Sequence, residues 1–370
     1  MSQTNWFEVA NTDEISTPSL LVYPERVMYN IKEMLRIAGS PEQLRPHVKT
    51  YKMAEVIQMQ RDYGIDKFKC ATVAEAELLA STGAKDILLA MQPVGPNIAR
   101  LFEVVTHYPE LQFSCLVDNQ ISVDAISQEA QKRNQHIGIF IDINNGMNRT
   151  GIAPGQAVIE LFKNISGHML LNAKGFHVYD GHLRIPDLKE RKSACTEALQ
   201  PVLNIKLELE RQGYTVGSIV VGGSPTFPAH AHRNDVVLSP GTVLLWDAGY
   251  GSKFPDMNFQ HAALLAMRLI SKPKPNQFCL DLGHKALASE MNFPRVHFLN
   301  TNDFEQIGQS EEHFVVSVTH PEKYNIGDVF YAVPMHICPT VAKYPSVITV
   351  ENHEVTGAWA VAARDHKITY

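Results

Sequence analysis

The sequence predicts an α/β protein made of a (β/α)8 TIM barrel and a C-terminal, mainly antiparallel β domain. The first observation is a regular alternation of short apolar runs with amphipathic segments, which is typical of parallel strands that alternate with helices. The second is a change after Trp246, where helical periodicity fades and strand-like runs follow one another. We therefore assign residues 17–246 to the barrel, and residues 1–16 and 247–370 to the β domain.

Eight runs in the first part have the length and composition of strands that are buried on both faces. They cover residues 44–50, 67–72, 86–91, 112–118, 136–144, 173–181, 218–224 and 236–245. Between them, apolar residues recur at three- and four-residue spacing, which predicts helices. These helices cover residues 53–63, 73–82, 96–107, 119–133, 155–165 and 187–212, and a further helix over 25–38 precedes the first strand. Glycines such as Gly83 and Gly213 predict where helices end.

The second part contains strand-like runs that are separated by turn residues. The predicted strands cover residues 262–271, 278–282, 314–319, 329–333 and 347–351. The lysine- and proline-rich residues 272–276 predict a loop. We expect an antiparallel domain, which the N-terminal segment joins.

Composition narrows the functional class. The chain has 370 residues, of which 45% are hydrophobic and 19% charged, so a large core is expected and disorder is not. A formal net charge of -6 argues against binding to nucleic acid. The longest apolar runs are strand-sized, and residues 1–8 lack the regions of a signal peptide, so no membrane contact is expected. Five scattered cysteines fit a reducing cytoplasm.

Lys49 is the candidate for covalent catalysis. Along an extended strand His47, Lys49 and Tyr51 point to one side. A lysine that faces a barrel lumen loses solvation, which favours a neutral amine that can attack an aldehyde such as that of pyridoxal 5'-phosphate. His47 shares this side and is included as a cofactor-binding candidate. Lys52, on the opposite side and at the start of a helix, is the alternative lysine.

A glycine-rich turn follows the seventh predicted strand. Gly222 and Gly223 allow the backbone to approach an anion closely, and the hydroxyl of Ser224 adds a donor. Barrel enzymes often hold phosphate at the loops after strands seven and eight, so Gly241 and Thr242 complete the candidate phosphate site. The alternative is that the turn is only a tight bend.

Three further side chains lie near the carboxyl ends of the fifth and sixth predicted strands. The guanidinium of Arg149 can pair with a phenolate or a carboxylate, or else with Asp142 in the loop. Tyr179 can hydrogen-bond a cofactor ring. His182 can transfer protons near neutral pH, or it is simply a histidine at the barrel rim.

His336 and Cys338 form the candidate metal site. Imidazole nitrogen and thiolate sulfur both suit zinc, and on an extended segment residues two apart point the same way. Two protein ligands leave positions open for water or substrate, where the cation acts as a Lewis acid on a substrate hydroxyl. The alternative is an ordinary strand with a packed histidine and a buried thiol.

Four segments carry a resemblance to a known family: Leu44–Thr50, Cys70–Glu77, Asp86–Ala90 and His336–Thr340. With these motifs the chain resembles the D-threonine aldolase and D-serine dehydratase family, whose members are pyridoxal 5'-phosphate enzymes with an alanine-racemase-like barrel and a β domain. The resemblance implies a homodimeric lyase that acts on β-hydroxy D-amino acids and uses zinc or manganese.

The same resemblance implies a role for each candidate residue. Lys49 would form the Schiff base, Arg149 would face the cofactor's phenolic oxygen, and Tyr179 would meet its pyridine nitrogen. The phosphate would lie against the glycine-rich turn, Gly241 and Thr242, and the metal would bind His336 and Cys338. Cys338 stands where threonine-cleaving bacterial members tend to carry Asp and dehydratases Cys, which favours zinc and dehydration. Tyr51 stands where relatives often have His.

Two other functions remain open on the sequence. An amino-acid racemase on the same scaffold needs a second acid or base opposite the lysine and no metal, so the His-x-Cys motif argues against it. A non-catalytic pyridoxal 5'-phosphate carrier has a single domain, so the predicted β domain argues against that function.

Overall fold

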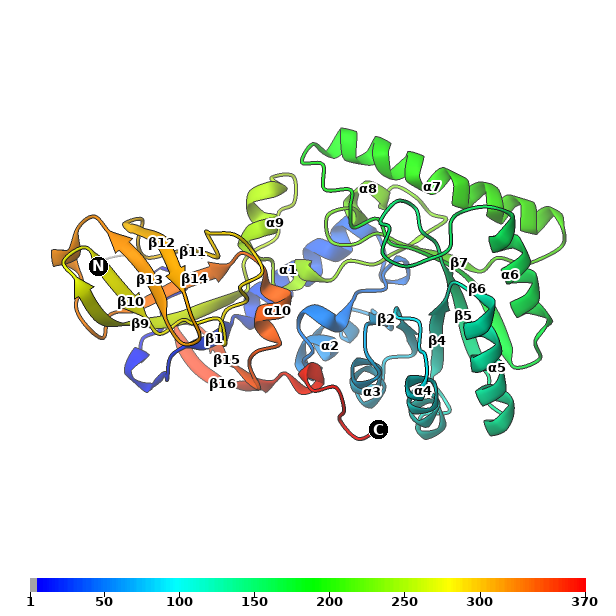
Figure 1. Cartoon of the computed structure of the whole chain (residues 1–370), viewed down its shortest axis with the longest axis horizontal. Coiled ribbons are helices and arrows are strands. Elements are labelled where there is room, and N and C mark those ends of the chain that lie inside the picture. The colour runs from blue at the N-terminus through cyan, green and yellow to red at the C-terminus, as the bar shows by residue number, and fades with distance from the viewer. Residues whose placement is uncertain (1–4) are drawn as a thin grey trace. The chain divides into compact units, whose positions relative to one another are not determined.

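The computed structural model describes residues 5–370 and divides into two compact units. The barrel unit comprises Met34–Lys49, Ala54–Gly241 and Asp365–Tyr370, and the β unit comprises the described residues through Glu33, Thr50–Met53 and Thr242–Arg364. Figure 1 labels their helices and strands. The first four residues, part of the segment assigned from sequence to the β domain and read as lacking a signal peptide, lie outside the described part.

The barrel unit is built on seven parallel strands in the order of the sequence. They are β2 (Lys67–Cys70), β3 (Asp86–Leu89), β4 (Gln112–Val117), β5 (Ile137–Asp142), β6 (Leu171–Val178), β7 (Ser218–Val221) and β8 (Val237–Leu238). Residues 44–47 connect the two edges, since Leu44 bridges to Leu238 in β8 and His47 bridges to Lys69 in β2. The structure therefore confirms the predicted barrel, with this short segment as its eighth stave.

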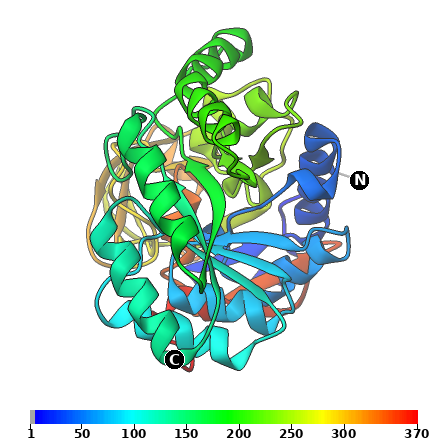
Figure 2. The ribbon, with the colours of Figure 1, turned by 90° about the vertical axis from the view of Figure 1, so that its right-hand side faces the viewer.

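Helices follow the strands around this sheet, as Figure 2 shows from the side. They are α2 (Ala54–Arg61), α3 (Val73–Ser81), α4 (Pro96–His107), α5 (Gln120–Arg133), α6 (Gln156–Gly167), α7 (Leu188–Arg211) and α8 (Phe227–His230). The helix α1 (Pro24–Ala38) precedes them, and its residues through Glu33 belong to the β unit. Side chains cap several N-termini: Thr72, for example, accepts a hydrogen bond from the amide of Glu75. Gly83 and Gly213 follow α3 and α7 with positive φ, as the sequence predicts.

The β unit contains a mostly antiparallel sheet of nine strands. The strands are β1 (Ser19–Val22), β9 (Ala263–Lys274), β10 (Gln277–Leu280), β11 (Val296–Phe298), β12 (Phe304–Gln309), β13 (Phe314–Val318), β14 (Val329–Pro334), β15 (Ser346–Glu351) and β16 (Glu354–Ala360). Two short helices, α9 (Ala248–Lys253) and α10 (Ile337–Val341), belong to this unit. Its core gathers N-terminal side chains such as Phe7 and Ile15 with Tyr331 and Val350.

The structure corrects four details of the prediction. Of the run over residues 236–245, only β8 (Val237–Leu238) is a strand, and Thr242–Leu244 form a 3-10 helix in the β unit. The run over 44–50 is not one strand: its ladder contacts end at His47, and Val48–Thr50 form a 3-10 helix. The strand at Ser19–Val22 pairs with β9 and β15, so it lies in the sheet of the β unit although the barrel was predicted to begin at residue 17. β9 continues through Lys274 where a loop was predicted, because it pairs with β10 at that position.

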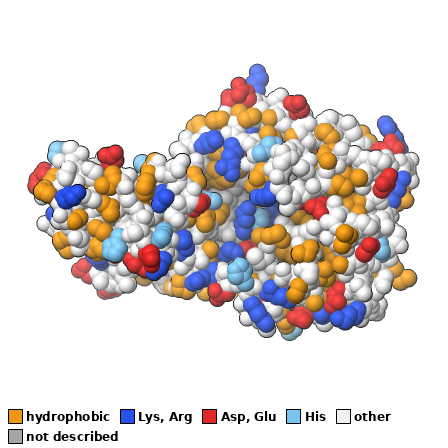
Figure 3. Space-filling model, in the orientation of Figure 1, with side chains coloured by type: hydrophobic (Ala, Val, Ile, Leu, Met, Phe, Trp, Pro, Cys, Tyr) orange, Lys and Arg blue, Asp and Glu red, His pale blue; other side chains and the backbone are white. Residues whose placement is uncertain are grey.

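The surface carries charged side chains of both signs, in agreement with the composition of the sequence. Figure 3 shows acidic and basic side chains interspersed over the visible face. Among residues 5–370, no helix combines the length and the apolar composition that crossing a membrane requires.

Candidate active site

A cavity of about 380 Å³ lies where the carboxyl ends of the barrel strands meet. Its wall is formed by His47, Lys49, Ala71, Ala90, Met91, Gln92, Leu116, Asp118, Asp142, Ile143, Met147, Arg149, Thr150, His177 and Tyr179. Four of the predicted cofactor-binding residues thus share one cavity: His47, Lys49, Arg149 and Tyr179. They come from the segment before β2, from the loop after β5 and from the end of β6.

Lys49 reaches this cavity from a 3-10 helix, not from a strand. The direction of the Lys49 side chain was predicted from strand alternation, and that reason was wrong, because the strand contacts end two residues earlier, at His47. The turn is supported locally, since the amide of Lys49 lies 3.2 Å from Nδ1 of His47. The alternative Lys52 donates instead to the backbone carbonyl of Ala363, at 3.2 Å, within the β unit.

The ring of Tyr179 has three cations around it. The guanidinium carbon of Arg149 lies 5.1 Å from the ring centroid, Nζ of Lys69 5.8 Å and Nζ of Lys49 5.9 Å. Glycine is needed next to this ring, because a Cβ at Gly223 would lie 2.9 Å from its Cε2 and one at Gly181 still closer to its Cζ. Tyr179 is therefore held at the centre of a cationic group.

A buried series of hydrogen-bonded polar side chains begins in the wall of the cavity and continues behind it. Nδ1 of His177 is 2.7 Å from Oδ1 of Asp142, and Nε2 of His177 is 3.4 Å from Nζ of Lys69. Thr150 also donates to Asp142, at 2.8 Å, so the alternative pairing of Arg149 with Asp142 is not the one observed. Burial and then repulsion from Lys49 lower the pKa of Lys69 to about 7.

The pKa values of the two groups that are linked to Lys69, His177 and Asp142, are shifted as well. Burial, and then the charge of Lys69, lower the pKa of His177 below its ordinary value. Burial works against ionisation of Asp142, but hydrogen bonds from His177 and Thr150 outweigh it, so that the pKa of this carboxyl is lowered. Lys69 was missed in the sequence analysis. Its signal was a lysine in the middle of a short strand that is otherwise predicted to be buried.

Hydrogen bonds to neighbouring protein groups stabilise the glycine-rich turn after β7. The amide of Gly222 donates to the carbonyl of Val178, and that of Gly223 to Oγ1 of Thr226. The hydroxyl of Ser224 accepts from the amide of Gly241 at 3.2 Å. Gly222 and Gly223 thus shape the turn while their N–H groups are engaged, so a phosphate would need other donors.

Behind this turn lies a second buried cluster, made of Asp180, Cys195 and His230. Its ligand-type atoms lie within 4.8 Å of one another, yet Nε2 of His230 is already 2.7 Å from Asp180, which also accepts from Thr226. Burial, and then the charge of Asp180, raise the pKa of the Cys195 thiol. These mutual hydrogen bonds describe a network that holds the turn.

His182 lies in an exposed loop after β6 and is not among the residues that line the cavity. Its ring packs toward Gly146, where an added Cβ would lie 2.8 Å from Nε2.

The predicted metal pair belongs to the β unit. His336 is the residue before α10 and Cys338 lies in its first turn, so the extended segment assumed from sequence is wrong. The two side chains nevertheless meet, and their hydrogen bond is the main reason that the pKa of His336 is raised to about 9. Nδ1 of His336 lies 2.6 Å from Oε1 of Glu290.

Two hydroxyl groups converge on the sulfur of this pair. Oγ1 of Thr50 lies 3.2 Å from Sγ of Cys338, and Oγ1 of Thr242 lies 3.5 Å from it. Thr50 directly follows Lys49 in the sequence. Thr242, a predicted phosphate ligand, therefore contacts the thiol of the metal pair.

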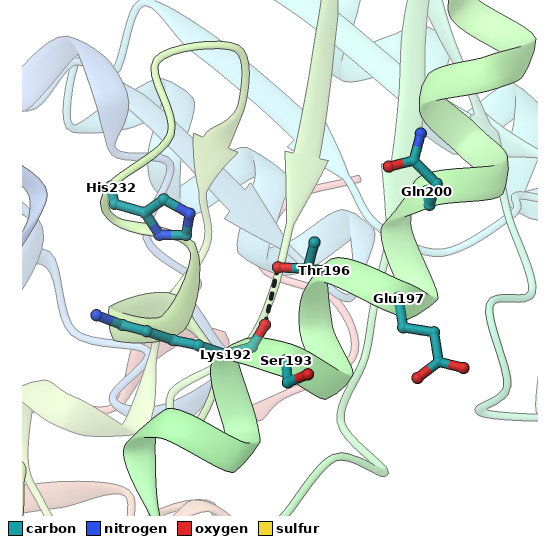
Figure 4. Close-up of a pocket in the computed structure, with 6 residues that line it drawn as sticks. All are labelled: Lys192, Ser193, Thr196, Glu197, Gln200 and His232. Carbon is teal, nitrogen blue, oxygen red and sulfur yellow. Dashed lines mark hydrogen bonds between the residues drawn. The ribbon is translucent and has the colours of Figure 1, made fainter.

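A wider hollow lies over α7, lined by Lys192, Ser193, Thr196, Glu197, Gln200 and His232. Figure 4 shows these side chains spread out, with a hydrogen bond from Thr196 to the carbonyl of Lys192 drawn between them. The group contains no convergent set of reactive side chains, so the cavity at the strand ends is the candidate active site.

Two protein families match the chain. The family described as alanine racemase, N-terminal domain, matches residues 22–248, and the family described as putative serine dehydratase domain matches residues 262–350.

Curated relatives span the chain. A 3-hydroxy-D-aspartate aldolase of Paracoccus denitrificans (strain Pd 1222) is 27% identical, covering 95% of this chain and 92% of its own length. A D-threonine aldolase of an Arthrobacter species is 25% identical, with 95% and 93% covered. A D-serine dehydratase of Dictyostelium discoideum is 23% identical, with 92% and 96% covered.

Solved structures share the fold. D-threonine aldolase from Filomicrobium marinum superposes with a TM-score of 0.89 at 23% identity, covering 98% of this chain and 99% of that one. D-threo-3-hydroxyaspartate dehydratase from Delftia sp. HT23 superposes with a TM-score of 0.82 at 18% identity, with 94% and 97% covered.

Proposed function

Since this chain belongs to the family of the alanine racemase N-terminal domain and is a lyase related to D-threonine aldolases and D-serine dehydratases, we propose that it cleaves or dehydrates β-hydroxy D-amino acids with pyridoxal 5'-phosphate and a divalent metal. The observation that carries the proposal is the cavity at the strand ends. It gathers an amine, a guanidinium and a phenol, from Lys49, Arg149 and Tyr179.

These groups fit the proposed cofactor. Lys49 would bind its aldehyde covalently, Arg149 would face the phenolic oxygen, and Tyr179 would meet the ring nitrogen. The hydroxyl of Ser224 is the proposed phosphate donor, beside a turn shaped by Gly222 and Gly223, because the amide of Gly241 already donates to it and Thr242 belongs to the β unit. When bound, pyridoxal 5'-phosphate supplies an electron sink for the bond that breaks at the substrate's α-carbon.

Lys49 is the proposed acid and base of the reaction. Its amine, once exchanged for that of the substrate, takes the α-proton in a dehydration or returns a proton after a retro-aldol cleavage. His182 was proposed from sequence for such a role, but its loop is exposed and outside the cavity wall. We therefore assign proton transfer at the α-carbon to Lys49.

His336 and Cys338 are the proposed metal ligands. A nitrogen and a sulfur donor favour zinc over manganese, and the cation would act as a Lewis acid on the substrate's β-hydroxyl. Glu290 engages Nδ1 of His336 and leaves Nε2 as the ring nitrogen that can bind a cation. Cys338 in place of aspartate supports dehydration over cleavage.

Product analysis tests this function. Purified enzyme loaded with pyridoxal 5'-phosphate and zinc is incubated with D-serine, D-threonine and D-threo-3-hydroxyaspartate, with and without a chelator. Keto acid that disappears with the chelator supports a dehydratase, and glycine plus an aldehyde supports an aldolase. Release of the L-enantiomer, insensitive to chelator, identifies a racemase instead. Cofactor binding without turnover of these amino acids identifies a carrier.

We further propose that the protein acts in the cytoplasm as a homodimer. The absence of disulfides between cysteines of residues 5–370 supports a reducing compartment. Light scattering of the purified protein tests the oligomeric state: a mass of twice 41.3 kDa is expected, and a single chain mass contradicts it.

A further inference from the structure

Lys69 is the buried cation that the proposed reaction does not use. Its side chain is in the middle of β2 and is almost completely buried, at 3% exposure. It is not among the residues that line the cavity, whereas its hydrogen-bond partner His177 is. A lysine is costly in such a place unless it is paired, so its partners indicate its function.

The donors and acceptors of this chain can be arranged in one way when Lys69 is charged. An ammonium group only donates, so Nε2 of His177 must accept the hydrogen bond from Lys69. An ionised carboxylate only accepts, so Nδ1 of His177 must carry the proton that faces Asp142. The imidazole is then neutral, and it bridges a cation and an anion.

The surrounding charges favour this arrangement. Arg45 and Lys49 act on Lys69 as like charges, and Asp142 and Asp180 as opposite ones. His177 faces Lys69, Asp142 and Arg149. The pKa of Lys69 is lowered to about 7 and that of His177 below its ordinary value, so the positive charge that the pair gains as the pH falls through neutrality rests on Lys69.

We propose that Lys69 is a positioning residue of the active-site cavity, which keeps His177 neutral and fixes its proton on Nδ1. The positive charge then lies behind the wall, and the cavity meets an uncharged imidazole beside Lys49, Arg149 and Tyr179. The consequence for catalysis rests on the proposed function, since it concerns the environment of the bound cofactor. The protonation state itself does not depend on that function.

Nuclear magnetic resonance of the imidazole nitrogens tests the protonation state in the cofactor-free protein. In the native sequence, His177 is expected to titrate below the ordinary range of a histidine and, while it is neutral, to carry its proton on Nδ1. Lys69→Met removes the cation, and since Asp142 then favours the imidazolium, the titration midpoint of His177 should rise by about one pH unit or more. Lys69→Gln should also raise it, because it keeps a donor but lacks the charge.

Lys67→Met is the matched control, because Lys67 is two residues away on the same strand and donates to the carbonyl of Glu42 at the surface. It should leave the midpoint of His177 unchanged. The proposal is overturned if His177 of the native protein carries its proton on Nε2, or if both Lys69 variants titrate like the native protein. Circular dichroism of each variant verifies that the fold persists.

The loaded enzyme gives the second readout. The absorbance of bound pyridoxal 5'-phosphate is followed against pH, and Lys69→Met should move its midpoint while Lys67→Met should not. An unmoved midpoint in Lys69→Met contradicts the link to the cofactor. Failure of the native protein to bind the cofactor refutes the proposed function instead, and the imidazole titration still decides the role of Lys69.

Discussion

Oε1 of Glu290 lies 2.6 Å from Nδ1 of His336, although 46 residues separate them. A histidine that binds a metal usually gives its other ring N–H to a carboxylate, which fixes the tautomer and makes the ligating nitrogen more basic. The contact joins the loop before β11 to the residue that precedes α10, and it supports Nε2 of His336 as the ligand.

Removing this carboxylate should weaken metal binding. We expect Glu290→Ala to raise the dissociation constant for zinc about 10- to 100-fold, because the imidazole loses its orienting partner. Glu290→Gln should lose less, since its amide oxygen can still accept. Competition with a chelating dye measures the affinity. Glu312→Ala is the control, because Glu312 is an exposed partner of Lys285; zinc affinity that is equal in all three variants contradicts the assigned role.

The turn after β7 should depend on Thr226. Its fully buried hydroxyl accepts from Gly223 and donates to Asp180. Thr226→Val leaves the amide of Gly223 and Oδ1 of Asp180 without this partner, so the free energy of unfolding should fall by about 1–3 kcal/mol and the affinity for pyridoxal 5'-phosphate should fall with it. Urea denaturation and cofactor titration measure the two effects. Thr196→Val is the control, because Thr196 is exposed on α7, and it should change neither quantity. If Thr226→Val binds the cofactor as tightly as the native protein, the turn does not contribute to phosphate binding.

The space beside Tyr179 should not accept a methyl group. In Gly223→Ala the new Cβ would lie 2.9 Å from Cε2 of the ring, so the ring must move. Overpacking of this kind costs about 1–3 kcal/mol, and we expect about tenfold weaker cofactor binding. Gly167→Ala is the control, because no heavy atom lies within 4 Å of its added Cβ. Unchanged binding in Gly223→Ala would show that the position of Tyr179 is unimportant to the cofactor.

Lys69 should also make stability depend on pH. Its pKa is about 7 when folded and near 10.5 when unfolded, so between these values the unfolded chain holds more protons and stability rises with pH. The free energy of unfolding of the native protein relative to Lys69→Met should therefore increase above pH 7, by up to about 1.4 kcal/mol per pH unit. Urea denaturation at several pH values measures this difference, and a constant difference contradicts the buried, depressed lysine.

Local pattern was enough to predict most of the barrel. The helix α4 (Pro96–His107) has the bounds that its apolar spacing predicts, because proline begins it and one apolar face is buried. Strands buried on both faces are equally visible, as at β5. Lys49 was identified correctly as a lining residue of the cavity, but through a strand that ends too early, since the pairing partner of residues 44–47 is set by β8 and β2.

The rest required contacts that the sequence does not encode locally. Glu290 and His336 approach through the packing of the β unit, and Asp180 reaches Thr226 and His230 across about fifty residues. The residues of β1 were predicted to belong to the barrel, yet β1 pairs with β9 and β15 in the sheet of the β unit. Its pairing partners are distant in the sequence, so local pattern could not identify them. Lys69 stood out in the sequence as a lysine within a buried strand, but only the structure shows that His177 is its hydrogen-bond partner.

The covalent attachment of the cofactor tests the central claim most directly. The loaded enzyme is reduced with borohydride, digested, and analysed by mass spectrometry for the lysine that carries the pyridoxyl group. We predict that the label lies on Lys49 and that Lys49→Ala loses it together with the visible absorbance. A label on Lys69 or Lys52, or a Lys49→Ala variant that keeps its absorbance, would contradict the account.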